Sequence, residues 1–588
     1  MKLSDYVVDF LASQGVGEIF EVCGGAVTHL LDSVHGRSDI RCVSMHHEQA
    51  AAFAAEGFAR VSGRPGVAMA TSGPGATNLI TGIGSCFFDS TPAIFLTGQV
   101  NTYEYKGDSE ARQVGFQETD IVRIVEPIVK YAVMISDPVT ILYHLEKAMF
   151  LATSGRPGPV LIDIPMNVQR ADIDPGTLTG FTPAAAEQTP ALDGAIVAKI
   201  AAALRQAARP VILSGGGVGA AGARDELLRL ADETGLPVVT TLLGKDTCPN
   251  DHPSFAGMIG TYGHRFANLT IANADFVLAI GARLDTRQTG TDPVTFAREA
   301  TFVHVDIDPS ELGHKVAADI ALLADAKEFL GSLAEELSGF DAGQLAPWQD
   351  KIASWRDRYP TIEDAPAGGI HPNVLFREIT KNLPGDAIIC ADVGQNQMWA
   401  AQSVVIKRGQ RFITEGGMGA MGSSLALAIG AAFARPGRLV CALCGDGGFQ
   451  LNSQELETVH HLNLPIKLVM VNNGCYGMVK QFQEQYFGGR FQSTVLGYSC
   501  PDYMALAGAY DIPAVRIDKA DHAADAAAVL IKDDEPAFLE AMIDSSIPIL
   551  PKLGMGRPVE DQDPLLPREQ LQKEMIIDMI DDEEATRQ

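Results

Sequence analysis

The chain has 588 residues, of which 46% are hydrophobic and 20% are charged, and its formal net charge at pH 7 is −28. A chain of this length is expected to form three or four domains, and its acidity argues against binding nucleic acid through neutralised phosphates. Its nine scattered cysteines argue against a disulfide framework and favour a reducing cytoplasm as its location.

The N-terminal stretch MKLSDYVVDFLASQGV predicts an amphipathic helix and not a signal peptide, because Asp5 and Asp9 interrupt its apolar pattern. No apolar run of the sequence reaches the roughly 18 residues that a membrane-spanning helix needs. We therefore expect no association with a membrane.

Three long stretches then alternate strand-like and helix-like patterns. This alternation predicts an α/β protein with three consecutive doubly wound, mainly parallel sheets. We place the three domains at residues 1–175, 190–340 and 370–548, and a proline-rich C-terminal tail at 549–588. The segment TPAAAEQTPALDG at 182–194 has the composition of a linker.

The third domain contains two polar turns, each directly after an apolar run. Gly445-Asp446-Gly447-Gly448 follows the run that ends at Cys444, and Asn472-Asn473-Gly474 follows the run 466–471. In open α/β sheets, ligands bind beyond the carboxyl ends of the strands. A carboxylate and a carboxamide oxygen suit Mg²⁺, and glycines let backbone N–H groups approach an anion. A Gly-Asp-Gly turn alone is common, but the pair predicts a diphosphate held through a divalent metal.

This pair of turns resembles the signature of thiamin-diphosphate enzymes. The resemblance implies thiamin diphosphate and Mg²⁺ as cofactors, with Asp446, Asn473 and the backbone carbonyl of Cys475 as the metal ligands. It also implies that Glu48, which opens an alanine-rich segment, contacts the pyrimidine ring from the first domain. The alternative for Glu48 is a helix N-terminal carboxylate that the helix dipole favours.

The same resemblance makes the first domain pyrimidine-binding and the third diphosphate-binding, and it assigns further residues to the cofactor. Met421 would support the bend of the cofactor, although it could equally be core. The other residues implied are Pro74, Asn78, Gln395, Asn396, Gly419, Gly445, Gly447, Gly448, Tyr476, Gly477 and Met478.

Within these enzymes the chain resembles the acetolactate synthase (acetohydroxyacid synthase) catalytic subunit, through EGFARVSGRPGVAMATSGPGATN (56–78), TPAIFLTGQV (91–100) and FQETDIV (116–122). The resemblance implies decarboxylation of pyruvate and transfer of the two-carbon unit to a second keto compound, giving 2-acetolactate. It also implies a homodimer or homotetramer with active sites between subunits, and it leaves a separate regulatory subunit open. One chain would contribute the catalytic residues Gly25, Glu48, Phe116 and Gln117. Its partner would contribute Met478 and Phe482.

The middle domain resembles the FAD-binding, Rossmann-like domain of that family, through SGGG (214–217) and GARLDTR (281–287). The three glycines after a strand suit a pyrophosphate, but they do not form G-x-G-x-x-G. Asp306 and Asp325 would bind hydroxyl groups, or else they are ordinary turn carboxylates. A structural FAD would contact Arg156, Gly215, Gly216, Gly217, Thr241, Leu242, Gly260, Gly281, Arg283, Asp285, Arg287, Asp306 and Asp325.

Several positions depart from the acetolactate synthase pattern. Glu21 and Cys23 replace small or rigid residues, Phe482 replaces a tryptophan, and Tyr262 replaces a histidine. The loop 101–115 is about six residues longer, and its Lys106 and Arg112 could bind a phosphate or carboxylate or could simply be solvated. The longer loop and the smaller aromatic ring at position 482 leave open a different acceptor, such as a nucleotide-linked keto-sugar. A pyruvate oxidase is a further alternative. A catalytically silent scaffold is another, but the presence of Glu48, Asp446 and Asn473 together argues against it.

Overall fold

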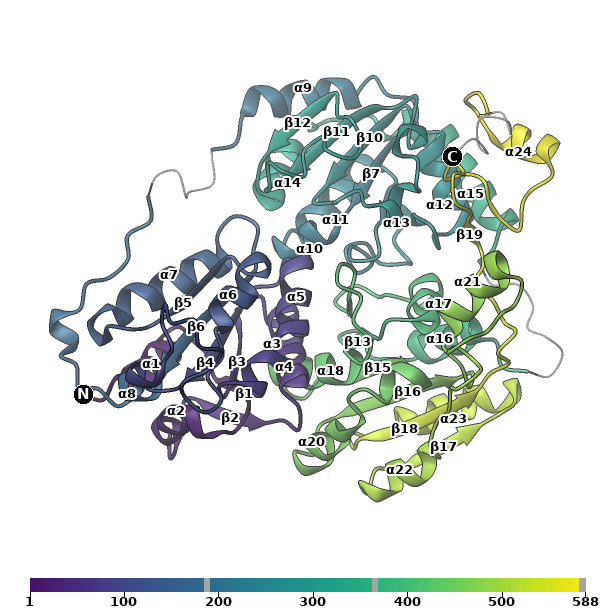
Figure 1. The fold of residues 1–588 in the computed structure, drawn as a ribbon. Coiled ribbons are helices and arrows are strands. Elements are labelled where there is room, and N and C mark those ends of the chain that lie inside the picture. Colours follow the sequence, from purple (N-terminus) through teal and green to yellow (C-terminus); the bar gives the residue numbers. More distant parts are fainter. Residues whose placement is uncertain (185–190, 362–368, 581–588) are drawn as a thin grey trace.

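The computed structural model describes residues 1–184, 191–361 and 369–580. Part of the linker predicted at 182–194 lies outside these ranges, and so does the chain end 581–588. The described residues form three six-stranded sheets, one after another along the chain (Figure 1). The strand pairs of all three sheets are parallel, which confirms the predicted fold class.

The first sheet is buried between two layers of helices. Helices α1 (Leu3–Ser13) and α7 (Ile141–Thr153) pack on one face, and α3 (Glu48–Ser62) and α5 (Ile80–Phe88) pack on the other. Burial on both faces explains why its central strands are continuous apolar runs without alternation. The strands, in spatial order, are β2 (Arg41–Ser44), β1 (Glu18–Val22), β3 (Gly66–Ala70), β4 (Ala93–Gln99), β6 (Pro159–Pro165) and β5 (Tyr131–Met134).

The second sheet is covered by α14 (Ala326–Glu336) on one face and by α12 (Arg265–Ala272) on the other. Its strand order reverses between β7 and β10, which is where a ligand is expected in such a sheet. The spatial order is β12 (Ile320–Leu323), β11 (Thr301–Asp306), β10 (Phe276–Ile280), β7 (Pro210–Ser214), β8 (Val238–Thr240) and β9 (Phe255–Met258).

The third sheet has α18 (Ser424–Ala434) on one face and α16 (Pro372–Lys381) with α17 (Gln395–Ser403) on the other. Strands β15 and β16 are neighbours, so the two polar turns that follow them emerge side by side at one edge. The spatial order is β14 (Arg411–Thr414), β13 (Ile388–Ala391), β15 (Val440–Gly445), β16 (Ile466–Asn472), β18 (Ala537–Met542) and β17 (Ala514–Ile517).

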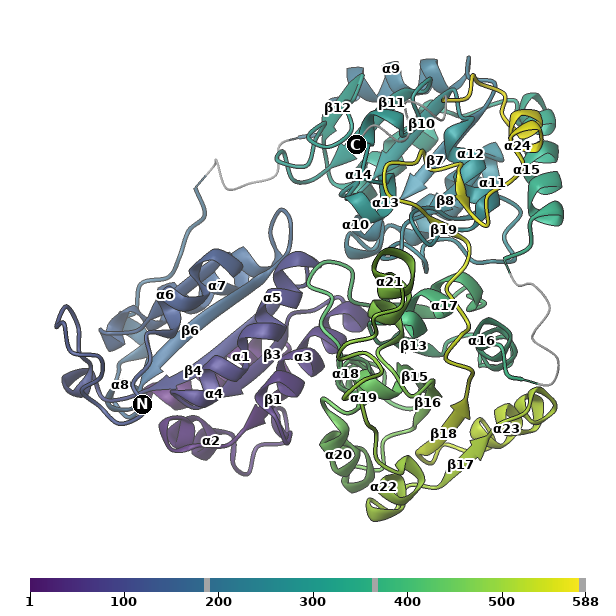
Figure 2. The same ribbon diagram turned by 45° about the vertical axis from the view of Figure 1, so that its right-hand side comes forward.

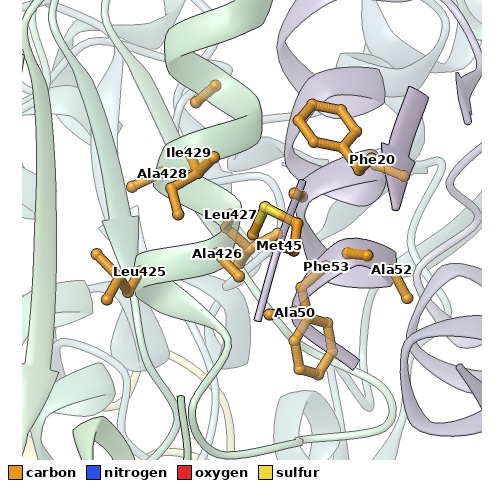
Figure 3. Close-up of a cluster of buried hydrophobic side chains, with 14 of the residues drawn as sticks. Phe20, Met45, Ala50, Ala52, Phe53, Leu425, Ala426, Leu427, Ala428 and Ile429 are labelled. Atoms are coloured by element: carbon orange, nitrogen blue, oxygen red, sulfur yellow. The ribbon is translucent and has the colours of Figure 1, made fainter. Parts of the chain in front are cut away.

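Helices α3 and α18 join the first and third domains into one hydrophobic core (Figure 3). Two glycines allow their backbones to approach closely. A Cβ atom on Gly57 would lie 2.2 Å from the carbonyl oxygen of Leu427, and one on Gly430 would lie 1.9 Å from that of Ala54. The third domain is therefore fixed against the first by backbone contact.

The C-terminal tail returns to the central domain, where it forms β19 (Lys552–Leu553), β20 (Gln562–Asp563) and α24 (Arg568–Glu574) (Figure 2). The buried carboxylate of Glu574 accepts hydrogen bonds from Trp355 Nε1 at 2.9 Å and from the Tyr359 hydroxyl at 3.0 Å. It also pairs with Arg358. These contacts attach the tail to α15 (Ala346–Arg358), the helix that follows the residues assigned to the central domain.

In the described ranges, no helix combines the length and the apolarity that crossing a bilayer requires.

Candidate active site

The two polar turns of the third domain open into one cavity with an empty volume of about 970 Å³. Asp446 begins the short helix α19 (Asp446–Phe449) directly after β15, and Asn473 directly follows β16. The cavity is lined by these two residues and by ten other predicted ones: Gln395, Asn396, Met421, Gly445, Gly447, Gly448, Cys475, Tyr476, Gly477 and Met478. Gly419 does not line it, although its φ of +69° requires a residue such as glycine.

Two tyrosines that the sequence did not single out fix Asp446. The Tyr498 hydroxyl donates a hydrogen bond of 2.6 Å to Oδ2 of Asp446, and the Tyr503 hydroxyl donates one of 2.8 Å to its backbone carbonyl. Burial raises the pKa of the Asp446 carboxyl to about 6, and the hydrogen bond from Tyr498 partly offsets this rise. The carboxylate is therefore held in a defined orientation at the floor of the cavity.

The donor set around this cavity fits a magnesium diphosphate. It offers one carboxylate, the amide of Asn473 and the carbonyl of Cys475, and Mg²⁺ in proteins uses few carboxylates. The described residues contain no cluster of three His, Cys, Asp or Glu side chains suited to a metal, so a site of the zinc type is not found among them. The Asn473 amide is fixed by a 3.0 Å hydrogen bond from its Nδ2 to Oε1 of Gln395.

The glycines of this cavity are required by close packing. A Cβ atom on Gly477 would lie 1.9 Å from Oε1 of Gln395, and one on Gly448 would lie 2.5 Å from Oδ2 of Asp392. Larger residues would displace the side chains that shape the cavity. A backbone cradle of this kind suits a phosphate, because its N–H groups are exposed to the ligand.

A second cluster of predicted residues lies in the first domain, around Glu48. Asn78 Nδ2 donates a hydrogen bond of 2.9 Å to Oε2 of Glu48. The turn at Gly73-Pro74-Gly75 lies beside both Glu48 and Gln117, since a Cβ atom on Gly75 would be 3.3 Å from Oε1 of Glu48 and one on Gly73 would be 3.0 Å from Cβ of Gln117. The structure thus brings together Glu48, Asn78, Pro74 and Gln117.

The cap of helix α3 is not provided by Glu48. His47 performs this role, because its Nδ1 accepts a 3.0 Å hydrogen bond from the backbone N–H of Gln49. The carboxylate of Glu48 is directed to Asn78 instead. Glu48 still lies in the first turn of α3, where the helix dipole favours a carboxylate, so its position is compatible with both roles.

The tight turn with Gly25 lies near the same cluster, on Thr71. A Cβ atom on Gly24 would lie 2.4 Å from Cβ of Thr71, and the N–H of Ala26 donates a 3.1 Å hydrogen bond to Oγ1 of Thr71. Glu21, one of the departures, is only 2% exposed and accepts a 2.6 Å hydrogen bond from the Ser44 hydroxyl. Its burial raises the pKa of its carboxyl group.

The two clusters are separate half-sites within one chain. The cavity at Asp446 is lined by residues 393–494, and no described residue of the first domain lines it. Phe116 is 85% exposed and Phe482 is 44% exposed. The ring of Phe482 packs on Tyr486 and Phe487 of its own helix, α21 (Gly477–Phe487). A single chain therefore presents two open surfaces, each with an exposed aromatic residue.

The central domain has two adjoining cavities at the carboxyl ends of β7, β10 and β11. The larger has an empty volume of about 990 Å³ and the smaller one of about 510 Å³, and both touch Arg283. Their linings include the predicted residues Arg156, Gly216, Gly217, Thr241, Leu242, Gly281, Arg283, Asp285, Arg287, Asp306 and Asp325. Gly215 and Gly260 line neither cavity, because both pack against backbone: a Cβ atom would lie 2.0 Å from Gly281 O and 2.5 Å from Arg287 O, respectively.

Several charged groups of these cavities already have protein partners. Asp325 caps α14 by accepting hydrogen bonds from the N–H groups of Lys327 and Glu328, at 2.8 and 3.1 Å. Arg156 pairs with Asp308 and Glu311 at 3.0 and 2.9 Å. Burial raises the pKa of Asp306 to about 6. The size of the cavities fits a dinucleotide. Asp325 also has the alternative role predicted for it, that of an ordinary turn carboxylate.

Comparison with known proteins agrees with this geometry in all three domains. Models of thiamine pyrophosphate enzymes match residues 1–124 as the N-terminal TPP binding domain, 197–333 as the central domain and 392–541 as the C-terminal TPP binding domain.

Similar proteins extend over nearly the whole chain. A probable acetolactate synthase large subunit of Methanocaldococcus jannaschii is 39% identical, with 94% of each chain covered. The acetolactate synthase isozyme 2 large subunit of Escherichia coli is 36% identical, with 95% of this chain and 98% of that protein covered. The acetolactate synthase large subunit of Corynebacterium glutamicum is 36% identical, with coverage of 92% and 86%. The chain therefore belongs to the thiamine pyrophosphate enzymes and, among them, to the family of acetolactate synthase large subunits.

Proposed function

We propose that this protein decarboxylates pyruvate and joins the two-carbon unit to a second 2-keto acid, which gives 2-acetolactate when that acid is also pyruvate. The observation that carries the proposal is the juxtaposition of Asp446 and Asn473 in one glycine-lined cavity, in a chain whose relatives are named acetolactate synthases. The keto-sugar acceptor, the oxidase and the silent scaffold are not needed to account for these relatives.

Each half-site has a defined task in this proposal. Asp446, Asn473 and the carbonyl of Cys475 would hold Mg²⁺ and, through it, the diphosphate. Bound thiamin diphosphate would supply a nucleophilic carbon that adds to the keto carbon of pyruvate, and a positively charged ring that takes up the electrons released by decarboxylation. Glu48 would hold a proton at its carboxylate beside the pyrimidine, while Asn78 fixes that carboxylate in place.

The substrate would lie between side chains of two subunits. In one subunit, Gln117 would orient the substrate and Phe116 would keep water away from it. In the other subunit, Met478 and Phe482 would form the opposite wall of the pocket. The exposure of Phe116 and Phe482 and the separation of the two half-sites support a homodimer or homotetramer with shared active sites. The relatives' designation as large subunits supports a separate regulatory subunit as a further partner.

FAD is the third cofactor of the proposal, in a structural role. The two adjoining cavities of the central domain support it by their size and by their position at the reversal of strand order. A cytoplasmic location is supported by the nine cysteines, all of which are free thiols.

The proposal is tested by incubating the protein with thiamin diphosphate, Mg²⁺, FAD and pyruvate as the only substrate. We expect one 2-acetolactate for every CO₂ released, from two pyruvates consumed, formed at about 1 s⁻¹ or faster, as is usual for enzymes. Acetolactate is measured as acetoin after acid treatment. Release of CO₂ without acetolactate would contradict the proposed carboligation with a second pyruvate.

A further inference from the structure

A single carboxylate closes the long loop that precedes Phe116. Oε1 of Glu118 accepts a 2.7 Å hydrogen bond from the N–H of Lys106. Oε2 accepts hydrogen bonds from the N–H groups of Val114 and Gly115, at 2.7 and 3.2 Å. Glu118 thus joins the beginning of the loop to its end, and it does so from a site where the residue is only 7% exposed.

The loop between these two ends has few other attachments. Residues 107–114 are all exposed, so they add no buried apolar contact. The side chain of Gln113 donates a 3.1 Å hydrogen bond, and this too goes to Glu118, at its backbone carbonyl. An exposed loop with so little packing is ordered mainly by the hydrogen bonds that close it.

Hydrogen bonds of Glu118 also fix the backbone conformation around the two residues before it. The N–H of Glu118 donates a 3.2 Å hydrogen bond to the carbonyl of Gly115, while the N–H of Gly115 donates to its carboxylate. Between them, Gln117 adopts a φ of +64°, which a residue with a Cβ atom adopts at a cost of about 1 kcal/mol. Phe116 is 85% exposed and so is not positioned by packing within its own chain.

We propose that Glu118 is a positioning residue for the reaction, because its carboxylate closes the loop 106–118 and so directs Phe116 and Gln117 toward the substrate. The inference rests on the proposed function, which assigns Phe116 and Gln117 to the substrate pocket. Without the closed loop, water would reach the two-carbon unit before the second keto acid does. The unit would then take up a proton and leave as acetaldehyde, so that less than one acetolactate would form for every CO₂ released.

The experiment compares the complete enzyme, loaded with its cofactors, with its Glu118→Ala and Glu118→Gln variants. Trypsin reports on loop closure, because Lys106 and Arg112 both lie in the loop. We expect Glu118→Ala to raise the rate of cleavage after Arg112 about tenfold, as expected when a closing interaction of this strength is lost. Glu118→Gln keeps one acceptor oxygen and should give an intermediate rate.

The activity of the same variants reports on positioning. For Glu118→Ala we expect a higher KM for pyruvate and a share of acetaldehyde among the products, with the concentration of thiamin diphosphate needed for activation unchanged. Asp108→Asn is the matched control, because Asp108 is an exposed acid of the same loop for which no such backbone bonds are described. It should resemble the wild type in cleavage and in products.

Two results would overturn the inference: cleavage unchanged in Glu118→Ala, or faster cleavage with KM and product ratio both unchanged. Should Glu118→Ala fail to fold, Glu118→Gln alone decides between these outcomes by the same two measurements. Failure of the proposed function is recognised separately, because the wild type itself would then form no acetolactate while the cleavage rates still report on the loop.

Discussion

Among single residues, Tyr498 adds most to the description of the proposed metal site. Its hydroxyl donates to Asp446 at 2.6 Å, although the two residues are 52 positions apart in the chain. Partners of a metal ligand fix its orientation, and their loss commonly lowers metal affinity 10- to 100-fold. The sequence could predict Asp446 and Asn473, because each directly follows a recognisable strand. It could not predict Tyr498, because no local pattern connects a distant tyrosine to that turn.

Replacing Tyr498 by phenylalanine removes this hydrogen bond and leaves the ring in place. We expect Tyr498→Phe to need about tenfold more Mg²⁺ for half-maximal activity at saturating thiamin diphosphate. The measurement is a Mg²⁺ titration of acetolactate formation. Tyr143→Phe, in helix α7 of the first domain, should leave the titration unchanged. An unaltered Mg²⁺ requirement in Tyr498→Phe would mean that the hydroxyl does not orient the ligand.

Glu118 illustrates a related limit of sequence reasoning. It stands in the FQETDIV stretch that carried the family resemblance, but the sequence drew attention to its neighbours Phe116 and Gln117. Its role depends on hydrogen bonds from backbone N–H groups. Because nearly every residue type has such a group, the sequence does not reveal which residues donate these bonds. Only the folded loop brings these donors to it.

Among the elements, the contact of α3 with α18 is the feature that relates the two half-sites. Both helices are alanine-rich, and alanine has the highest helix propensity. Their pairing could not be predicted, because the contact joins residues such as Gly57 and Leu427 that are far apart in the chain. The three parallel sheets, in contrast, follow from patterns that are local to each domain.

Gly57→Ala tests this contact directly. A Cβ atom 2.2 Å from the Leu427 carbonyl oxygen cannot be accommodated, so the two helices must move apart. We expect a loss of stability of about 1–3 kcal/mol or more, as is typical of overpacked cores, and a lower thermal unfolding midpoint. Gly331→Ala is the control: it lies within α14, and a Cβ atom there meets nothing within 4 Å.

The control should be neutral or should raise the unfolding midpoint, since alanine is favoured over glycine in a helix by about 1 kcal/mol. Equal unfolding midpoints for Gly57→Ala and the wild type would show that the backbones are not in contact at this point. A lower midpoint in both variants would indicate a general effect of the substitution.

For the whole molecule, the sequence predicted three consecutive parallel sheets and a thiamin-diphosphate enzyme, but not how the three parts are arranged. The structure adds that Glu48 and Asp446 belong to separate half-sites of one chain, each with an exposed aromatic residue nearby. In the dimer that we propose, a symmetric pair of chains would bring each half-site to the complementary surface of its partner, because a two-fold interface repeats every contact. The central claim is therefore an acetolactate synthase whose active sites are each built from two chains.

The most direct test combines two inactive variants, Glu48→Gln and Asp446→Asn, which carry different affinity tags and are produced together. Alone, each should lose about 100-fold or more of its turnover, since one loses its acid–base group and the other its metal ligand. In the doubly tagged dimer, one site contains both mutations and the other contains neither. We predict that it forms 2-acetolactate from pyruvate at about half the wild-type rate per dimer, as expected of one intact site in a two-fold pair. A doubly tagged dimer as inactive as the single variants would contradict the claim, because it would place Glu48 and Asp446 of one site in the same chain.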